Sequence, residues 1–353
     1  MQESLVHKLQ CPFSNQPLIL TVIEKKLKQY NTQVIEEIWK GYLQSPIGLI
    51  FPIIEGVPRM LIESMFEHEA FLKEHIEDLD QIRNQFLRDH KKELDYCQSK
   101  NTRTKKAFSI EWSFLKPEKQ DRVWHDDISS LIHVFEKETA VKKESLNNKI
   151  VYDIGAGHGL MTESIGKYAK EAVGLELSEA VLRAYKINKN PNVHYIQGDL
   201  QFHPFKAQNA DILYSSGVII CTDNVYRSLQ TMEPILKTKG RISLWLYHPQ
   251  NNLFHLFWNS LRFITTLMPL WILVPFLMFL VLPLTYSIKK LNGKNKKLTW
   301  REEMIDLMDQ FCPQYRHEVK HSQAQSWLRE LGYENISNST ENNYGFTVIG
   351  DKA

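Results

Sequence analysis

Residues 149–159 read Lys-Ile-Val-Tyr-Asp-Ile-Gly-Ala-Gly-His-Gly, and this stretch decides the fold class. The apolar run 150–152 predicts a buried strand of a parallel sheet, and a glycine-rich turn follows it. Glycine lets the backbone turn tightly and approach a ligand closely. A helix expected from about Leu160 to Lys170 would point the positive end of its dipole at that ligand. The stretch therefore predicts a nucleotide-like ligand where a strand passes through a turn into a helix.

The spacing of the glycines separates two kinds of nucleotide site. A dinucleotide fingerprint, G-x-G-x-x-G, places its third glycine where this chain has Leu160. The segment from Asp153 to Gly159 reads D-x-G-x-G-x-G instead. It resembles motif one of the class I S-adenosylmethionine (SAM)-dependent methyltransferases. Because an ordinary tight turn in an α/β domain can also carry three glycines, the segments downstream decide between these readings.

Two further strand ends arrive in the order that this resemblance requires. Residues 172–176 predict a second strand that ends at Glu176, a carboxylate that can accept hydrogen bonds from both hydroxyls of a ribose. Residues 193–199 predict a third strand that ends in Gly-Asp. In the methyltransferases that the chain resembles, the aspartate at this place, here Asp199, contacts the adenine amino group.

The fourth and fifth strands complete the pattern. Residues 210–218 predict a fourth strand, whose end would lie beside the methyl donor, and residues 241–247 a fifth. Between them we expect a helix that includes residues 236–239 and stops at Gly240. Near the C-terminus a short helix, 323–331, precedes two strands, 333–337 and 344–350, which resemble the closing hairpin of the methyltransferase sheet, with its last strand antiparallel.

The resemblance is to the type 11-like, small-molecule branch of the class I methyltransferases. It implies an α/β fold with a Rossmann-like, seven-stranded, mostly parallel sheet and helices on both faces, accompanied by a small N-terminal β-rich module and a hydrophobic helical insertion. The implied cofactor is S-adenosyl-L-methionine. The residues expected to bind it are Asp153, Gly155, Ala156, Gly157, Gly159, Glu176, Leu177, Asp199, Leu200 and Ser215.

Composition restricts the partners and the compartment. The 353 residues are 43% hydrophobic and carry a net charge of +2, without the basic footprint of a nucleic-acid-binding protein. Four scattered cysteines form no C-x-x-C pair, and the N-terminus lacks a signal-peptide pattern, so we expect a cytoplasmic protein. The fourth strand carries Tyr-Ser-Ser-Gly at 214–217, in place of the N/D-P-P-Y/F segment of enzymes that methylate amines of DNA bases, and resembles small-molecule methyltransferases such as the ubiquinone type.

Residues 1–62 predict a separate small module. Its opening Cys11-Pro12-Phe13-Ser14 and its strand Pro-Ile-Ile-Glu-Gly-Val-Pro at 52–58 resemble zinc-ribbon-like domains found beside or fused to methyltransferases. Ser14 replaces the second cysteine of the knuckle, and no other cysteine precedes Cys97. Because a tetrahedral zinc site needs about four N or S ligands, we predict a degenerate module with no metal.

Residues 63–125 predict a helical linker and a lid over the cofactor. Five apolar residues recur at helical spacing on one face: Leu72, Ile76, Leu79, Ile82 and Phe86. The segment 106–112, Lys-Ala-Phe-Ser-Ile-Glu-Trp, resembles the S-F-G-x-E-W segment that precedes motif one in many bacterial small-molecule methyltransferases. By that resemblance it belongs to the lid.

The methyltransferase core is expected in two parts, 126–247 and 316–353, separated by an insertion at 248–315. No charged residue occurs from Phe263 to Ile288, three prolines (Pro269, Pro275 and Pro283) divide this run into pieces of seven residues or fewer, and five lysines follow between 289 and 297. Three placements stay open: a lid buried against the substrate site, a segment on a membrane surface, and a spanning segment. All three favour an apolar or lipid-like substrate. The range 253–297 would provide peripheral contact with the inner face of the membrane.

Methyl transfer from a sulfonium is an in-line displacement that depends on positioning the acceptor, and a base is needed only when the acceptor must lose a proton. Candidates for that base are His248, Tyr247, His158 and Glu111. We therefore interpret the chain as an enzyme, a SAM-dependent methyltransferase acting on a small, apolar or lipid-like acceptor. Two other classes stay open: an RNA-modifying methyltransferase acting on tRNA, and a non-catalytic protein that retains the fold. The sequence does not define the oligomeric state.

Overall fold

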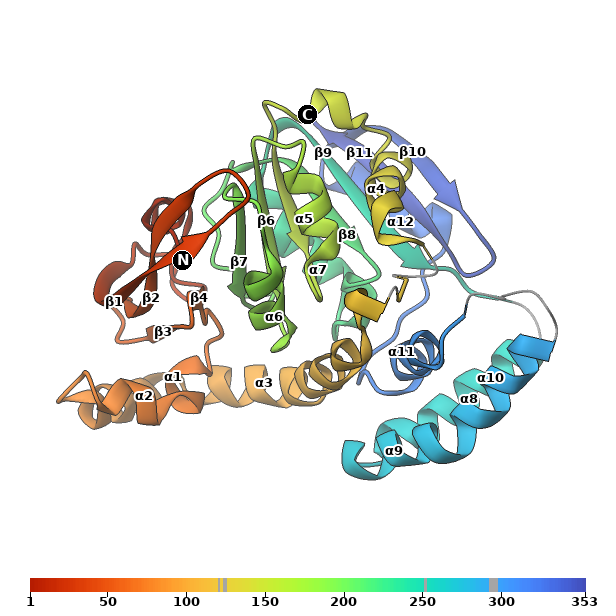
Figure 1. Ribbon diagram of the computed structural model, residues 1–353, viewed down its shortest axis with the longest axis horizontal. Helices are drawn as coiled ribbons and strands as arrows, with labels where there is room; N and C mark the ends of the chain where they lie inside the picture. Colours follow the sequence, from red (N-terminus) through yellow and green to blue (C-terminus); the bar gives the residue numbers. More distant parts are fainter. Residues whose placement is uncertain (120, 123–125, 251–252, 292–297) are drawn as a thin grey trace.

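The computed structural model describes residues 1–119, 121–122, 126–250, 253–291 and 298–353 (Figure 1). Its main sheet has seven strands in the order β10-β11-β9-β8-β5-β6-β7. The strands are β5 (Ile150–Ile154), β6 (Glu171–Glu176), β7 (Val193–Gln197), β8 (Ala210–Ser216), β9 (Leu236–Tyr247), β10 (Tyr333–Glu341) and β11 (Gly345–Lys352). Five strands pair in parallel, whereas β11 runs antiparallel to both β9 and β10. The predicted fold class and its antiparallel closing hairpin are confirmed.

Helices cover both faces of this sheet because its central strands alternate between two apolar cores. Val151 packs with side chains of α4, α5 and α6, whereas its neighbour Tyr152 packs with side chains of α7 and α12. The helices are α4 (Leu131–Thr139), α5 (Leu160–Gly166), α6 (Ala180–Ile187), α7 (Val225–Met232) and α12 (His321–Glu330). The strand order reverses at β5, with β6 on one side and β8 on the other. In open α/β sheets such a reversal creates a crevice for ligands at the carboxyl ends of the strands.

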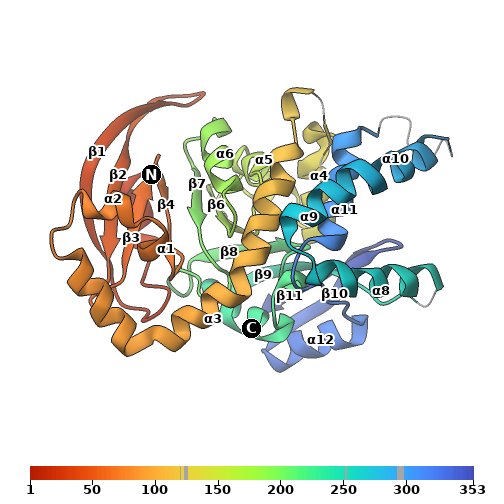
Figure 2. The ribbon, with the colours of Figure 1, turned by 90° about the horizontal axis from the view of Figure 1, so that it is seen from below.

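The N-terminal residues form a β-rich module that covers one edge of the main sheet (Figure 2). Its antiparallel strands are β1 (Ile19–Gln29), β2 (Val34–Gln44), β3 (Ile50–Ile54) and β4 (Val57–Pro58). Arg59 forms a parallel bridge with Gln197 of β7, and the Met60 N–H donates to the Gln197 carbonyl at 2.7 Å. The module thereby pairs with an edge strand that would otherwise be open.

The cysteine knuckle of this module is closed by a hydrogen bond. Cys11 is buried, and its Sγ accepts a hydrogen bond from the Ser14 N–H at 3.5 Å. Among the residues that the structure describes, no three His, Cys, Asp or Glu side chains gather in a way that could hold a metal ion. The likeness of the module to a zinc ribbon stays a prediction.

Arg59 fastens this module to the core, and its replacement tests the attachment. Its buried guanidinium donates from Nη1 to Gln197 Oε1 at 2.6 Å and to Glu179 Oε2 at 2.8 Å. We expect Arg59→Ala to lower the free energy of unfolding by about 2 kcal/mol, because a buried amide oxygen and a carboxylate lose their donor. Urea denaturation measures the change. Arg329→Ala, at an exposed position of α12, is the matched control, and an equal change in the two variants would contradict this role.

Three helices lead from the module to the core: α1 (Ser64–Glu67), α2 (Glu69–Lys73) and α3 (Leu79–Phe114). The apolar spacing from Leu72 to Phe86 predicted one continuous helix, and this was wrong. The chain leaves the helix between Glu74 and Asp78, yet the buried side chains of Leu72, Leu79 and Phe86 still reach one core. The three- and four-residue spacing of these apolar side chains therefore indicates which of them are buried, and it does not show that the helix is continuous. Helix α3 is kinked at His90, whose backbone angles are not helical, and it extends beneath the sheet (Figure 1).

The expected helix stop at Gly240 was also wrong. Helix α7 ends at Met232, and β9 already begins at Leu236, where Ala210 pairs with it. The register shifts after this pair, and Lys239 adopts a positive φ of 62°. A strand with such an irregularity carries the same Lys-Thr-Lys-Gly composition as a helix end, which explains the error.

The insertion folds as four helical segments: α8 (Leu253–Leu267), α9 (Leu270–Phe276), α10 (Leu282–Leu291) and α11 (Trp300–Phe311). A π-helical turn, Leu277–Val281, joins α9 to α10, so that Leu270–Leu291 is one helix. Our expectation that prolines cut this run into short pieces was wrong for two of the three. Pro269 caps the helix, but Pro275 precedes the wider π turn and Pro283 follows it, so both lie inside one continuous helix.

Candidate functional site

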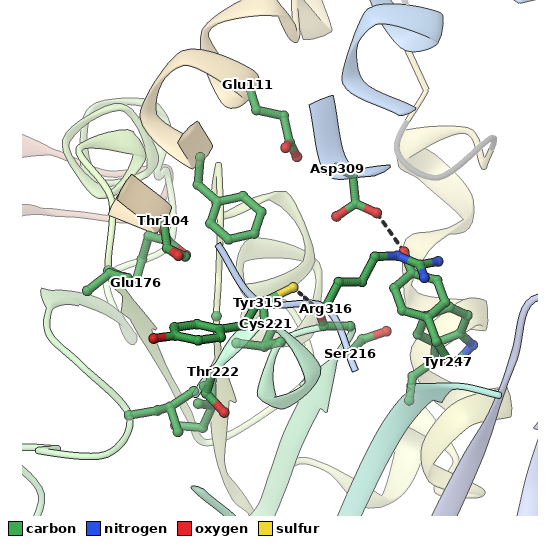
Figure 3. A pocket seen from close by; sticks show the side chains of 18 of the residues that line it. Thr104, Glu111, Glu176, Ser216, Cys221, Thr222, Tyr247, Asp309, Tyr315 and Arg316 are labelled. Carbon is green, nitrogen blue, oxygen red and sulfur yellow. Dashed lines mark hydrogen bonds between the residues drawn. The ribbon is translucent and has the colours of Figure 1, made fainter. Parts of the chain in front are cut away.

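One cavity of about 510 Å³ opens at the carboxyl ends of the parallel strands, a volume typical of a small-molecule site. Residues from β5, β6, β8 and β9 line it from the sheet, and residues of α3 and α11 line it from the opposite side (Figure 3). It therefore lies in the crevice that the reversal of strand order predicts.

The glycine loop after β5 adopts a backbone that requires glycine. Gly155, Gly157 and Gly159 have φ values of 86°, 53° and 83°. A Cβ on Gly155 would lie 2.2 Å from the Val218 side chain, and a Cβ on Gly157 would lie 2.9 Å from the Trp112 ring. Gly155 lines the cavity, whereas Gly157 and Gly159 form the turn behind it together with the buried Ala156.

Glu176 lines the cavity and also holds this loop. Its Oε2 accepts from the Gly157 N–H at 2.9 Å, and its Oε1 accepts from the Ser178 N–H at 2.8 Å. The side chain is only 5% exposed, and burial raises the pKa of its carboxyl group. Each carboxylate oxygen has a second lone pair, so the group can accept hydrogen bonds from a sugar diol while it keeps both backbone contacts.

Asp199 also lines the cavity, and side chains of α3 contact it. Lys100 donates to its Oδ2 in a buried ion pair, and Asn101 Nδ2 donates to the same oxygen at 3.1 Å. Leu177 and Leu200, two further residues predicted to bind the cofactor, also line the cavity. Sequence reasoning missed Lys100, because nothing in a long amphipathic helix marks the one lysine that reaches an aspartate 99 residues away.

Besides Ala156, Gly157 and Gly159, two more predicted cofactor residues, Asp153 and Ser215, lie outside the cavity lining. Asp153 is buried behind the loop, where the Thr162 hydroxyl donates to its Oδ2 at 2.5 Å. Ser215 is buried, and the structure brings its neighbour Ser216 to the cavity instead. Successive residues of a strand point to opposite faces, so an error of one position reverses the side.

Asp153 predicts a measurable pH dependence of stability. Burial raises its pKa from 3.8 to about 7, so the native state keeps a proton that the unfolded chain loses above about pH 4. The native state then binds more protons, and the free energy of unfolding falls as pH rises from about 4 to about 7. That pKa difference corresponds to roughly 4 kcal/mol.

Asp153→Asn removes this titration. We expect the variant to match the wild type near pH 4 and to exceed it by roughly 4 kcal/mol near pH 8, as measured by urea denaturation at both pH values. Glu93→Gln, at an exposed position of α3, should follow the wild type throughout. Parallel stability curves for Asp153→Asn and the wild type would contradict the assignment.

The four candidate bases separate into two groups. Glu111 and Tyr247 line the cavity. His158 is buried outside the lining, where its Nδ1 accepts from the Leu160 N–H at 3.1 Å and burial lowers its pKa to about 3. His248 lies at the end of β9 outside the lining, with Nε2 3.1 Å from the Asn342 carbonyl. The geometry therefore favours Glu111 and Tyr247 as candidates for the base.

Asp309 lies at the far end of the cavity and was not predicted from the sequence. Tyr247 donates its hydroxyl to Asp309 Oδ2 at 2.5 Å, and the Arg316 guanidinium lies over the Tyr247 ring at 3.9 Å (Figure 3). Asp309 belongs to α11, inside the insertion. A signal for it exists: Asp306 and Asp309 stand three residues apart among apolar side chains, which places two carboxylates on one helix face.

These residues fit an adenosyl sulfonium. The glycine loop leaves no room for a Cβ, Glu176 offers acceptors for a ribose, and Asp199 lies beside Leu177 and Leu200 at the neighbouring strand ends. Acidic side chains also suit a ligand with a positive charge on sulfur.

Comparison with known proteins gives a family match over part of the chain. Residues 152–244 match the methyltransferase domain family. No curated protein matches the chain. Similar solved structures include the CurJ carbon methyltransferase (13% identity, 58% of this chain and 49% of that chain, TM-score 0.37). A second is magnesium protoporphyrin IX methyltransferase from Synechocystis PCC 6803 with bound SAH (13% identity, 72% of this chain and 99% of that chain, TM-score 0.44). A third is a SAM-dependent methyltransferase from Aquifex aeolicus (13% identity, 68% of this chain and 100% of that chain, TM-score 0.40).

The chain thus aligns with about half of CurJ's length and with almost all of the other two chains. The family match covers the four strand ends β5, β6, β7 and β8 that build the cofactor side of the cavity. Residues 152–244 match a methyltransferase domain family, and S-adenosyl-L-methionine is the cofactor that the residues at these strand ends fit.

Proposed function

We propose that this chain is a methyltransferase that transfers the methyl group of SAM to a small, apolar or lipid-like acceptor. The observation that carries the proposal is that one cavity joins Gly155 and Glu176 on the cofactor side to Glu111, Tyr247 and Asp309 on the far side. A donor and an acceptor held in one enclosed space react as a pair, and positioning supplies most of the rate enhancement.

The roles of the residues follow from their places. When bound, SAM supplies an electrophilic methyl group. Glu176 would hold the ribose, Asp199 would lie at the adenine, and Gly155 with Ser216 would border the methyl donor at the strand ends. The α3 residues Thr104, Phe108 and Trp112 line the cavity from the opposite side and would exclude water. This agrees with the lid predicted for the segment 106–112.

Exposed apolar side chains on the insertion favour an apolar acceptor reached at a membrane. On helix 270–291, Leu273, Leu277 and Leu282 pack in one cluster with α11 and α3. The opposite face exposes Trp271 (77%), Phe279 (70%) and Leu284 (66%). On α8, Phe263 and Leu267 are also exposed. Single exposed apolar residues are common, but a contiguous apolar surface marks an interaction site.

The charge pattern favours an anionic membrane as the partner. Residues 248–301 contain no Asp or Glu but contain seven Lys or Arg. Lys294, Lys296 and Lys297 lie outside the described residues. Basic side chains beside an apolar helix face favour binding at the surface of anionic lipid.

Helix 270–291 is the one described helix that is long and apolar enough to cross a membrane. Because one of its faces packs on α11 and α3, we propose that it lies in the membrane surface and does not span the bilayer. A cytoplasmic protein that contacts the inner face of a membrane would fit this placement.

Methyl-labelled SAM tests the function. Purified protein is incubated with a total lipid extract or with bulk tRNA, and the labelled product is identified. We expect label in an apolar product only. Label in tRNA would instead support RNA modification, and it would come with salt-sensitive tRNA binding. Absence of label in every fraction, with SAM bound, would support a non-catalytic protein.

A further inference from the structure

Two carboxyl groups face each other at the far end of the cavity (Figure 3). Glu111 reaches it from α3 and Asp309 from α11. Glu111 is 2% exposed, and its Oε2 has no hydrogen-bond partner in the part of the chain that the structure describes. A buried acceptor without a donor is costly unless a ligand supplies one.

Basic side chains are fewer than acidic ones in the described lining of the cavity. Eight acidic side chains line the cavity: Glu111, Asp126, Glu138, Glu176, Asp199, Asp223, Asp306 and Asp309. The three basic ones are Lys100, Lys289 and Arg316. Each already has an acidic partner: Asp199 for Lys100, Glu303 at 2.6 Å and Asp306 at 3.2 Å for Lys289, and Glu318 at 3.2 Å for Arg316. The cavity therefore suits ligands with more than one positive charge.

The surroundings of Glu111 oppose its ionisation. Burial raises its pKa well above the ordinary value, and nearby Asp309, Glu176 and Asp306 raise it further. The other titratable or charged groups around the pair are Tyr247, Arg262, Arg316, Cys221 and Cys312. Because these effects raise the pKa of Glu111, a cation that arrives beside the carboxyl group favours loss of its proton.

We propose that Glu111 and Asp309 bind the protonated amine of an apolar acceptor, and that Glu111 takes up the proton which this amine must lose. This inference rests on the proposed function and names the chemical class of its acceptor. A sulfonium carries one positive charge, and an ammonium group supplies the second. An alcohol offers no positive charge to these two carboxyl groups, and a carboxylic acid would add a third acidic group beside them.

The proton and electron balance is complete within the site. Binding of R–NH₃⁺ releases the Glu111 proton to solvent, and the carboxylate then accepts one proton from the ammonium. The lone pair of R–NH₂ forms the N–C bond while the C–S bond of the donor breaks, with its electron pair remaining on sulfur. The product is R–NH₂–CH₃⁺ beside a neutral thioether, and Glu111 carries the proton.

Calorimetry with octylamine, octanol and octanoate tests the proposal. Full-length protein is titrated in the presence of S-adenosyl-homocysteine (SAH) at pH 7, in buffers with different ionisation enthalpies. We expect octylamine to bind at least about tenfold more tightly than octanol, with release of about one proton per amine. Equal affinity for amine and alcohol, or absence of proton release, would overturn the proposal.

Two variants test whether Glu111 and Asp309 bind the amine. Glu111→Gln and Asp309→Asn should each weaken octylamine binding by about 10- to 100-fold and leave SAH affinity within about twofold. Glu93→Gln, an exposed glutamate of α3, should change neither. If a variant does not fold, the preference of the wild type for octylamine over octanol, and the proton release on binding, still test the proposal. SAH binding without octylamine binding removes only this inference, whereas absence of SAH binding removes the proposed function.

Discussion

Replacing Glu176 with alanine is expected to weaken SAH binding by at least about 100-fold. The side chain offers both carboxylate oxygens to a ribose diol, and each hydrogen bond to a charged group contributes about 1.5–3 kcal/mol. The same oxygens hold the Gly157 and Ser178 N–H groups at 2.9 and 2.8 Å, so the substitution also loosens the glycine loop. Isothermal titration of SAH into the variant measures the loss directly.

A fold control distinguishes loss of the site from loss of structure. Glu93→Ala removes an exposed carboxylate from α3 and should retain wild-type affinity. Circular dichroism should show the same helix and strand content in Glu176→Ala as in the wild type. Wild-type SAH affinity in Glu176→Ala would show that this carboxylate does not hold the ribose.

Membrane binding is expected to fail when the apolar surface of the insertion is made polar. The variant replaces five exposed side chains with serine: Phe263, Leu267, Trp271, Phe279 and Leu284. Full burial of such a side chain contributes about 1.5–3 kcal/mol, so the five together should lower the affinity for vesicles by at least about 1,000-fold. Cosedimentation with vesicles of equal parts phosphatidylglycerol and phosphatidylcholine measures this affinity.

The N-terminal module offers a matched control for exposed hydrophobicity. Ile19, Leu27 and Val34 are 66%, 74% and 53% exposed on β1 and β2, and their replacement by serine should leave vesicle binding unchanged. Wild-type binding should weaken at high salt and on vesicles of phosphatidylcholine alone, because the basic residues contribute through charge. Equal binding by the five-residue variant and the wild type would exclude the insertion as the contact.

Five of the ten predicted cofactor residues line the cavity, because the chemistry at the strand ends is local: Gly155, Glu176, Leu177, Asp199 and Leu200. Each short apolar run ends in a residue with a specific task, and a strand followed by Gly155–Gly159 has few alternative structures. Ser215 was predicted to bind the cofactor, whereas its neighbour Ser216 lines the cavity. A shift of one position along a strand moves the side chain to the other face of the sheet. Gly240 was misassigned because turn-forming residues occur both at helix ends and at strand irregularities.

The acceptor side was not predictable in the same way. Asp309 reaches the cavity from a helix inside the insertion, and Lys100 reaches Asp199 from a helix 99 residues earlier in the chain. Both contacts depend on how helices pack over the sheet, which no local pattern specifies. Helix 270–291 is continuous because a π turn follows Pro275, and sequence spacing alone does not reveal such a turn.

Titration of the purified wild-type protein with SAM and with SAH tests the central claim most directly. A buried carboxylate and a glycine loop at the ends of parallel strands should bind both compounds saturably at one site, with Kd of about 10 μM or tighter. Absence of saturable binding of both compounds up to about 1 mM would contradict the account.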